Sequence, residues 1–461
     1  MTGRPILTAA ETKAAEDALF ARGMPVFDLM VRAGRAVADI AWDRFGPRET
    51  LVLCGPGNNG GDGYVIAARL RERGVAVRVA ASGEPNTGAA HEAREMWGGP
   101  VESLAEAASA PLAIDALFGT GLSRPLTDEI AAPATRLLAA ASARVAVDLP
   151  SGIATDDGAV LTTLPAAHLT VALGALKRAH RLMPAVAECG DVVVADIGLG
   201  DLPRGVIEIA RPAIAAPGLD ANKYTRGKVV VAAGAMPGAS LLASLSAQRA
   251  GAGYVELLGA EGDAPPYALV RRVWDDAALA DRRIGAIVIG PGLGMGGEAR
   301  RRLDLALTTD RPLVLDADAL TMLAKDGLGR LKGRAAPMVL TPHGGEYARL
   351  FPDAQGTALD KALAGARAAG AILLLKGACT VVAHPDGRAA IGAPAPAWLA
   401  SAGTGDILAG ILGTMLAQMD DPFAAAQAAV WLHSEAGRRA GPALIADDLI
   451  AELPGAIAAC L

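Results

Sequence analysis

Residues 51–74 read LVLCGPGNNGGDGYVIAARLRERG, and this stretch decides the fold. A short apolar run typical of a strand leads directly into a loop rich in glycine and asparagine, and a helical pattern then continues to Gly74. Such a loop exposes backbone N–H groups at a helix N-terminus, where a phosphate or another anion binds well. A turn that only caps the helix is the alternative, but Asn58, Asn59 and Asp62 supply more polar groups than a turn needs.

Strand-like and helical segments alternate along the rest of the chain. Two helical stretches occupy residues 8–42, and the proline- and glycine-rich stretch 199–221 places a domain boundary near residue 215. We predict two successive α/β domains, residues 1–212 and 213–461, the first with a parallel sheet covered on both faces. The expected strands lie at 51–54, 75–81, 112–118, 144–150, 169–174 and 192–198, and then at 228–234, 286–290, 312–318, 338–342, 371–377 and 379–385.

Composition and charge argue against several classes of partner. The 461 residues carry a net charge of −6 without a dense run of Lys or Arg, which indicates that nucleic acid is not a partner. Every long apolar run is broken by Gly, Pro or a charge, so we expect no membrane partner and a cytoplasmic protein. We also expect a homo-oligomer. The cysteines lie far apart without metal-ligand spacing, which favours reduced, buried thiols at Cys54, Cys189, Cys379 and Cys460.

Two strand-like runs of the first half end in a carboxylate that is followed by glycine. Asp115 lies in DALFGTGLSRP, and Asp148 lies in VAVDLPSGI with Ser151 just behind it. The carboxyl ends of parallel strands face the ligand crevice of an open sheet, so we expect these acids to converge with the first glycine loop. One such aspartate is commonly a helix cap, but two with the same layout favour a site.

The motifs PGNNGGDG, DALFGTG and DLPSG, in this order, resemble the NAD(P)H-hydrate epimerases over about residues 5–205. The resemblance implies a Rossmann-like three-layer α/β/α domain that interconverts the R and S hydrates of NADH and NADPH, with Asp148 as the acid/base. In related sequences the lysine that corresponds to Lys177 is followed by proline and glycine, whereas Lys177 of this chain is followed by Arg178 and Ala179. The resemblance implies that Lys177 contacts phosphate or takes part in catalysis. The implied ligands of a potassium ion (K+) are Asn59, Asp115 and Ser151. The residues implied to line the hydrated dinucleotide are Asn58, Asn59, Gly60, Gly61, Asp62, Gly119, Thr120, Gly121, Leu122, Ser123, Arg124, Pro125 and Asp148.

A second glycine loop, Gly403-Thr404-Gly405-Asp406, opens a helical stretch that continues to Leu416. Its bare N–H groups at the positive end of the helix dipole favour the negative charge of phosphoryl transfer. Asp406 can take a proton from a substrate hydroxyl. A simple N-cap is the alternative, but it leaves both glycines unexplained because each lowers helix propensity.

Two further loops of the second half carry polar groups suited to a nucleotide. Lys376, in LKGACT, can hold a phosphate as a point charge, with a hairpin turn as the alternative. His343, in TPHGGE, is the histidine that we expect to contact a ligand. We expect no specific role for His91, His168, His180, His384 and His433.

Seven motifs of the second half resemble, in order, the ADP-dependent NAD(P)H-hydrate dehydratases over about residues 220–455. They are Asn222-Lys223, where family members usually have His-Lys, then Pro237-Gly238-Ala239, GPGLG at Gly290–Gly294, Asp316-Ala317-Asp318, TPHGGE, LKGA and GTGD. The resemblance implies a ribokinase-like α/β domain that uses ADP with Mg²⁺. The residues implied to bind the adenosine phosphate are Lys376, Gly377, Ala378, Cys379, Thr380 and Gly405, and those implied to contact the hydrated dinucleotide are Ala239, Gly294, His343 and Asp406.

The two sets of motifs in one chain predict a bifunctional repair enzyme. Its first domain interconverts the R and S hydrates, and its second dehydrates the S form. In the second reaction Asp406 deprotonates the ring hydroxyl, the hydroxyl attacks ADP, and phosphate then leaves to restore NADH or NADPH. Three alternatives stay open: a small-molecule kinase as the second domain, a non-catalytic binding module as the first, and a dehydrogenase, which lacks a second catalytic group beside its glycine loops.

Overall fold

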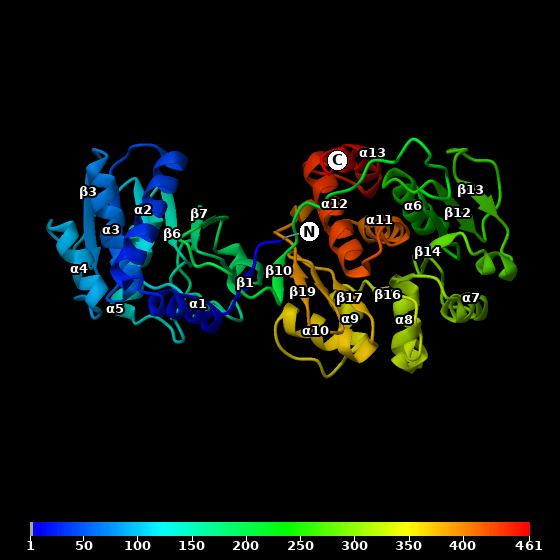
Figure 1. Ribbon diagram of the computed structural model, residues 1–461, viewed down its shortest axis with the longest axis horizontal. Helices are drawn as coiled ribbons and strands as arrows, with labels where there is room; N and C mark the ends of the chain where they lie inside the picture. The colour runs from blue at the N-terminus through cyan, green and yellow to red at the C-terminus, as the bar shows by residue number, and fades with distance from the viewer. Residues whose placement is uncertain (1–2) are drawn as a thin grey trace. The chain divides into compact units, whose positions relative to one another are not determined.

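A computed structural model of the chain describes residues 3–461 and divides them into two compact units, coloured in chain order in Figure 1. One unit comprises residues 4–204, and the other comprises Gly3 with residues 205–461. The cysteines are all buried, and none of them forms a disulfide within the described residues. Among the helices of residues 3–461, none has the length and apolar character that crossing a membrane requires.

The boundary between the units precedes the position that the sequence pattern indicates. Strand β10 (Val206–Glu208) pairs in parallel with β19 (Ala389–Ile391), so the C-terminal unit begins at Gly205 rather than at residue 213. A three-residue strand beside prolines has too little periodicity to be recognised in a sequence.

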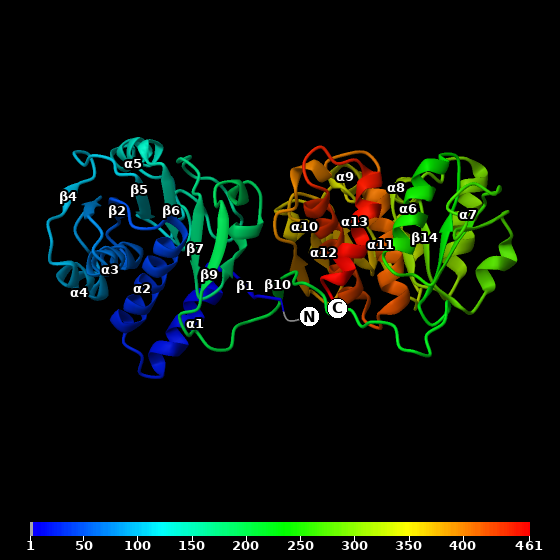
Figure 2. The same cartoon turned by 90° about the horizontal axis from the view of Figure 1, so that it is seen from above.

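The N-terminal unit contains a seven-stranded parallel sheet with helices on both faces (Figures 1 and 2). In sheet order its strands are β4 (Glu102–Ser103), β3 (Val77–Ala81), β2 (Thr50–Cys54), β5 (Leu112–Ala116), β6 (Ala143–Val147), β7 (Leu169–Leu173) and β9 (Asp191–Ala195). Its helices are α1 (Ala9–Ala21), α2 (Val26–Phe45), α3 (Asn58–Glu72), α4 (Gly88–Trp97) and α5 (Asp128–Ala140). Side chains of β2 point alternately to the two faces of the sheet, and each face has its own hydrophobic core. Val52 packs with α2, α3 and α4 on one face, whereas Leu51 and Leu53 pack with α5 on the other.

The C-terminal unit contains a ten-stranded sheet in which β18 runs antiparallel to both of its neighbours and all other pairs are parallel. After β10 and β19 its strands, in sheet order, are β18 (Val381–Ala383), β17 (Ile372–Leu375), β16 (Met338–Leu340), β15 (Leu313–Leu315), β14 (Ile284–Ile289), β11 (Lys228–Ala232), β12 (Tyr254–Leu258) and β13 (Val270–Arg272). Its helices are α6 (Pro237–Arg249), α7 (Gly297–Thr308), α8 (Ala317–Asp326), α9 (Gly344–Leu350), α10 (Ala358–Ala369), α11 (Thr404–Gln418), α12 (Pro422–Ala440) and α13 (Ala446–Ala458). Val229 and Val231 of β11 pack with α6, α11 and α12, and Val230 packs with α7 and α8 on the other face.

The predicted fold class is confirmed, and each strand-like run of the sequence contains a strand. Strand β12, which lies between β11 and the edge strand β13, escaped notice because Glu256 interrupts its apolar pattern. Glu256 is 2% exposed, and its carboxylate lies 2.7 Å from Lys228 Nζ. Lys228 becomes the partner of Glu256 only when the sheet forms, so the sequence alone does not distinguish Glu256 from a charged loop residue.

Candidate active sites

The first candidate site is a cavity of about 430 Å³ in the N-terminal unit. It opens where β2, β5 and β6 end, because its walls include the first turns of α3, which follow β2, and the segments that follow β5 and β6. The volume is that of a small-molecule site. From the predicted set it brings together Asn58, Asn59, Asp62, Gly119, Thr120, Gly121, Leu122 and Asp148.

The other predicted lining residues of this unit lie outside the cavity. A β-carbon on Gly60 would lie 1.8 Å from the carbonyl oxygen of Gly55, and one on Gly61 would lie 2.5 Å from the sulfur of Met30. Gly60 therefore lets α3 begin directly against the end of β2, and Gly61 lets α3 pack closely on α2. Three predicted residues of the β5 loop are exposed, namely Ser123, Arg124 and Pro125.

Asp148 occupies a strained turn at the end of β6 and lines the cavity. Its φ is 66°, and the N–H of Leu149 donates to the carbonyl of Val147 across it at 2.8 Å, which makes a γ-turn. Its Oδ1 accepts hydrogen bonds from Leu173 N–H at 3.0 Å and from the ammonium of Lys177. Its Oδ2 has no partner among residues 3–461, so one oxygen of a fixed carboxylate is left for a substrate.

Lys177 is fully buried and does not line the cavity. Its ammonium forms an ion pair with Asp148 and donates to the carbonyl of Leu173 at 2.7 Å. A buried ammonium is stable only when it is paired and hydrogen-bonded. The structure thus places Lys177 as the partner of Asp148.

Glu16, on α1, lines the cavity although the sequence does not single it out. Neither Glu16 nor Asp62 has a hydrogen bond or ion pair to its carboxylate among residues 3–461. Burial and the negative charge of Asp148 raise the pKa of Glu16, and burial with the charges of Asp148 and Glu16 raises the pKa of Asp62 well above its usual range. Acids with such perturbed pKa values in a cavity are typical of functional sites.

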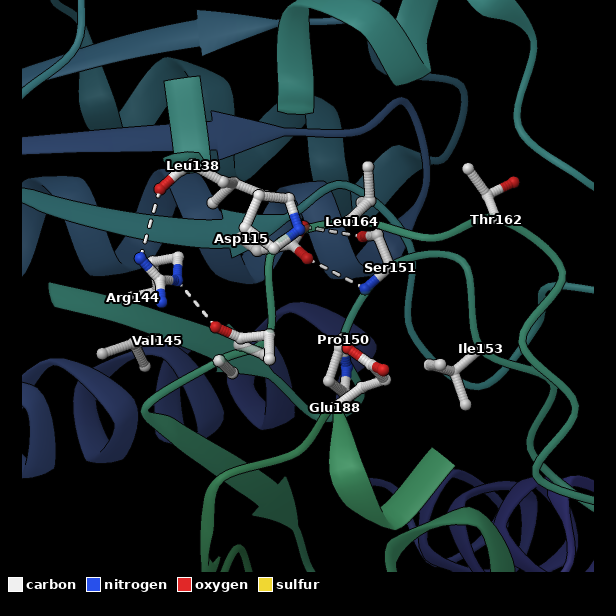
Figure 3. Close-up of a pocket in the computed structure, with 14 residues that line it drawn as sticks. Asp115, Leu138, Arg144, Val145, Pro150, Ser151, Ile153, Thr162, Leu164 and Glu188 are labelled. Carbon is white, nitrogen blue, oxygen red and sulfur yellow. Dashed lines mark hydrogen bonds between the residues drawn. The ribbon is translucent and has the colours of Figure 1, made fainter. Parts of the chain in front are cut away.

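Asp115 and Ser151, two of the predicted potassium ligands, bind each other (Figure 3). The hydroxyl of Ser151 donates to Asp115 Oδ1 at 2.6 Å, its N–H donates to Oδ2 at 2.8 Å, and Phe118 N–H donates to the same hydroxyl at 3.0 Å. Burial raises the pKa of Asp115, and the hydrogen bonds from Ser151 offset part of this effect. Asn59 lines the cavity, and its amide nitrogen is buried without a partner in the part of the chain that the structure describes. Carboxylate, hydroxyl and amide oxygens are ligands of hard cations, so the donor types fit K+.

The second candidate site forms around the N-terminus of α11. Gly403 precedes this helix with a φ of 86°, a conformation that strains any other residue, which explains the glycine. Asp406 lies in the first turn, and within residues 3–461 its carboxylate has no hydrogen bond or ion pair. Burial and the negative charge of Asp316 raise the pKa of Asp406 to about 6, although the charge of Lys376 lowers it. A carboxylate of this kind is ionised at neutral pH and suited to general base catalysis.

Lys376 connects this loop to neighbouring acids. Its Nζ lies 2.8 Å from Asp316 Oδ1 and 3.9 Å from Glu346 Oε2, and a β-carbon on Gly405 would lie 3.5 Å from it. Burial alone would lower the pKa of Lys376, but the charge and hydrogen bond of Asp316 raise it. A fixed positive charge thus lies beside the N–H groups of α11, an arrangement suited to phosphate. The two carboxylates also fit Mg²⁺, which proteins hold with one or two carboxylates and the phosphates of a nucleotide.

A cavity of about 540 Å³ opens beside the second glycine loop. Cys379 is buried and does not line it. Ala239 and Gly294 also lie outside it; the N–H of Gly294 donates to Asp318 Oδ2 at 2.7 Å, and the charge of Asp318 acts on Asp406. From the predicted set this cavity brings together His343, Lys376, Gly377, Ala378, Thr380 and Gly405.

Two histidines for which we expected no specific role lie beside the two sites: His180 is fully buried and His433 is half-buried. Nε2 of His180 lies 2.7 Å from the carbonyl oxygen of Asp148, and Nε2 of His433 lies 2.9 Å from that of Thr404. Burial lowers the pKa of His180 to about 3 and that of His433 to about 4. Both contacts depend on tertiary packing that the local sequence does not reveal.

Comparison with known proteins gives one answer for both halves of the chain. Residues 26–179 match the family model described as YjeF-related protein N-terminus, and residues 229–453 match the model described as NAD(P)H-hydrate dehydratase. A relative from Salinibacter ruber, named bifunctional NAD(P)H-hydrate repair enzyme Nnr, is 36% identical over 98% of this chain and 95% of its own. A relative of the same name from Gloeobacter violaceus is 37% identical over 94% of this chain and 92% of its own. The solved structure of a ribokinase-like superfamily protein from Enterococcus faecalis, 22% identical, covers 57% of this chain and 98% of its own with a TM-score of 0.51, which shows the fold of the C-terminal unit.

The fold and the two sites define a two-domain enzyme in which a Rossmann-like domain precedes a ribokinase-like domain. The alignments with the relatives from Salinibacter ruber and Gloeobacter violaceus include 98% and 94% of this chain. The chain belongs to the family of bifunctional NAD(P)H-hydrate repair enzymes, with an epimerase-type first domain and an ADP-dependent dehydratase-type second domain. The predicted family and enzyme class are confirmed, and the kinase and dehydrogenase alternatives are set aside.

Proposed function

We propose that Asp148 is the acid/base of hydrate epimerisation in this chain and that Asp406 is the base of ADP-dependent dehydration. The observation that carries the proposal is that each site holds an aspartate near a lysine, with at least one carboxylate oxygen that has no hydrogen bond among residues 3–461. Asp148 is ion-paired with Lys177, and Asp406 lies within the electrostatic influence of Lys376. Two such aspartates in separate sites suit two reactions that act in series on one substrate.

In the first site, the unpartnered Oδ2 of Asp148, when protonated, gives a proton to the hydroxyl of the hydrate. The bond between carbon and oxygen breaks, and water leaves from one face of the ring. Water then adds to the planar cation from the other face and returns the proton to Asp148, so atoms and charge balance. Lys177 and the N–H of Leu173 hold Oδ1, which keeps the reacting oxygen in place.

In the second site, Asp406 takes the hydroxyl proton of the S hydrate, and the hydroxyl oxygen attacks the terminal phosphorus of ADP. The bond between that phosphorus and AMP breaks. The new phosphate ester then leaves as phosphate, with loss of a proton from the adjacent ring carbon, and this restores NADH or NADPH. Lys376 and the N–H groups at the start of α11 stabilise the transferring phosphoryl group.

We further propose ions at both sites. Asn59, Asp115 and Ser151 hold K+, and its positive charge offsets the burial of Asp115. The support is the set of donor types and the unpartnered amide of Asn59, whose oxygen and nitrogen exchange places on a flip of the amide. Asp316 and Glu346 hold Mg²⁺ together with nucleotide phosphates, and Mg²⁺ supplies neutralising charge there.

The direct test uses purified protein with the separated R and S hydrates. Without ADP we expect interconversion of R and S, and with ADP we expect NADH or NADPH from the S form. Absence of interconversion would contradict the role of the first unit and support a non-catalytic module. A phosphorylated product that persists instead of reduced cofactor would contradict the role of the second unit.

A further inference from the structure

His180 lies in the short 3-10 helix η1 (Arg178–Arg181), which directly follows Lys177. The side chain is fully buried and does not line the cavity of the first site. An imidazole in this place cannot touch the substrate. Any effect on the reaction therefore passes through the groups that the ring contacts.

The contacts of His180 determine its tautomer. The backbone N–H of Lys177 donates to Nδ1 at 2.9 Å, so Nδ1 carries no proton. The proton of the neutral ring is then on Nε2, which donates to the carbonyl oxygen of Asp148 at 2.7 Å. Burial and the positive charge of Lys177 lower the pKa of His180 to about 3, so the ring stays neutral at physiological pH.

The carbonyl that His180 binds belongs to the strained turn of Asp148. A non-glycine residue with a φ of 66° persists only where its surroundings hold it. The N–H of Asp148 donates to the carbonyl of Val171 on β7 at 2.9 Å, and the carbonyl of Asp148 accepts from His180. The backbone of Asp148 is thus held on both sides, by β7 on one and by His180 on the other.

We infer that His180 is a positioning residue for epimerisation, whose single neutral ring joins the backbone of Asp148 to that of Lys177 and so sets the Asp148 carboxylate in the cavity. The two residues that the ring joins are also joined through their side chains by the ion pair. This closed arrangement leaves the carboxylate little freedom to turn. The inference rests on the proposed role of Asp148 in the reaction.

Two substitutions separate the two hydrogen bonds of the ring. In His180→Asn the amide oxygen takes the place of Nδ1 and can still accept from Lys177, but no donor reaches Asp148. In His180→Gln the amide nitrogen takes the place of Nε2 and can still donate to Asp148. We expect kcat of R-to-S conversion to fall about 10- to 100-fold in His180→Asn, with KM changed by less than about twofold, since a small misplacement of a catalytic group has effects of this size.

We expect His180→Gln to restore kcat to within about threefold of the original protein, because the bond to Asp148 is the one that matters. ADP-dependent dehydration of the S hydrate by the same chains serves as the internal control and should not change. Equal losses of thermal stability in both variants with unchanged kcat per folded molecule would mean that the ring is only structural, and would overturn the inference.

Asp148→Asn, measured alongside, distinguishes this inference from the proposed function. If that variant keeps its epimerisation, the role of Asp148 itself fails. If it loses epimerisation while His180→Asn keeps full kcat, the role of His180 alone fails.

Nitrogen NMR on the unaltered protein tests the two hydrogen bonds on which the inference rests, even if His180→Asn does not fold. We expect a neutral ring with its proton on Nε2 from roughly pH 5 to 8. A proton on Nδ1, or titration near the ordinary value of histidine, would overturn the inference.

Discussion

Asp148 and Asp406, which we propose as the catalytic groups, are held in opposite ways. Asp148 sits in a strained turn, and its carboxylate is bound by Lys177 and by the N–H of Leu173. Asp406 sits in the first turn of a regular helix, and its carboxylate has no hydrogen bond or ion pair in the part of the chain that the structure describes.

The difference matches what each reaction requires. Loss and return of a hydroxyl on two faces of a ring requires an acid whose position does not change, and a network of partners provides this. Transfer of a proton from a hydroxyl that then attacks phosphate requires a base that no other group occupies, and the raised pKa of Asp406 suits that role.

The largest expected effect is that of Asp406→Asn on dehydration. We expect kcat of NADH formation from the S hydrate with ADP to fall about 10³-fold, because the variant lacks the general base. The folded state raises the pKa of Asp406 to about 6, so its charge destabilises the fold above that pH. The variant should therefore melt at the same or a higher temperature at neutral pH. Loss of activity with a lower melting temperature would point to a structural role instead.

Asp148→Asn should have the next largest effect, a fall of about 10²-fold in the kcat of R-to-S conversion. It also leaves the charge of Lys177 buried without its partner, at a cost of about 3 to 5 kcal/mol to the N-terminal unit. The matched control is the double variant Asp148→Asn with Lys177→Met, which removes that charge. Chiral chromatography of the hydrates and thermal unfolding should show restored stability without restored epimerisation; recovery of both would mean that Asp148 only neutralises Lys177.

The pH dependence of dehydration should follow Asp406. The base must be ionised, so we expect kcat/KM to fall about tenfold per pH unit below about pH 6. Asp316→Asn removes a negative charge that raises this pKa, and it should shift the decline to lower pH. Rate measurements from acidic to neutral pH check both statements, and an unchanged profile in the Asp316 variant would count against the electrostatic account.

Glu16→Gln should have the smallest effect, a fall of about tenfold or less in kcat/KM of epimerisation. Glu16 lines the cavity, whereas its neighbour Asp17 on the same helix is exposed and paired with Lys13. Asp17→Asn is therefore the matched control and should leave the rate unchanged. Equal rates in the two variants would remove Glu16 from the site.

The comparison also shows what a sequence can predict. The glycine loops and the aspartates Asp148 and Asp406 follow strands or open helices, so the periodicity of the chain and the rules of parallel sheets locate them. Which residues of a motif face a cavity does not follow from the motif itself. Within one run, Asn58 and Asp62 line the cavity while Gly60 and Gly61 serve the packing of α3.

Glu16, His180 and His433 were not recognised from the sequence, because tertiary packing determines what surrounds them. Glu16 has the same local surroundings as the exposed Asp17 of α1, and nothing in its periodicity indicates a cavity. His180 and His433 bind backbone carbonyls of residues far away in the chain. A hydrogen bond to a distant backbone leaves no mark on local composition, so such groups become visible only in the fold.

The central claim is that the two aspartates serve two reactions in series, and it is tested most directly with a mixture of the R and S hydrates and ADP. Recovery of reduced-nicotinamide absorbance is followed for three proteins. The unaltered chain should recover the whole mixture, Asp148→Asn should stop near the share of the S form, and Asp406→Asn should recover almost nothing. Full recovery by Asp148→Asn at the rate of the unaltered chain would contradict the claim.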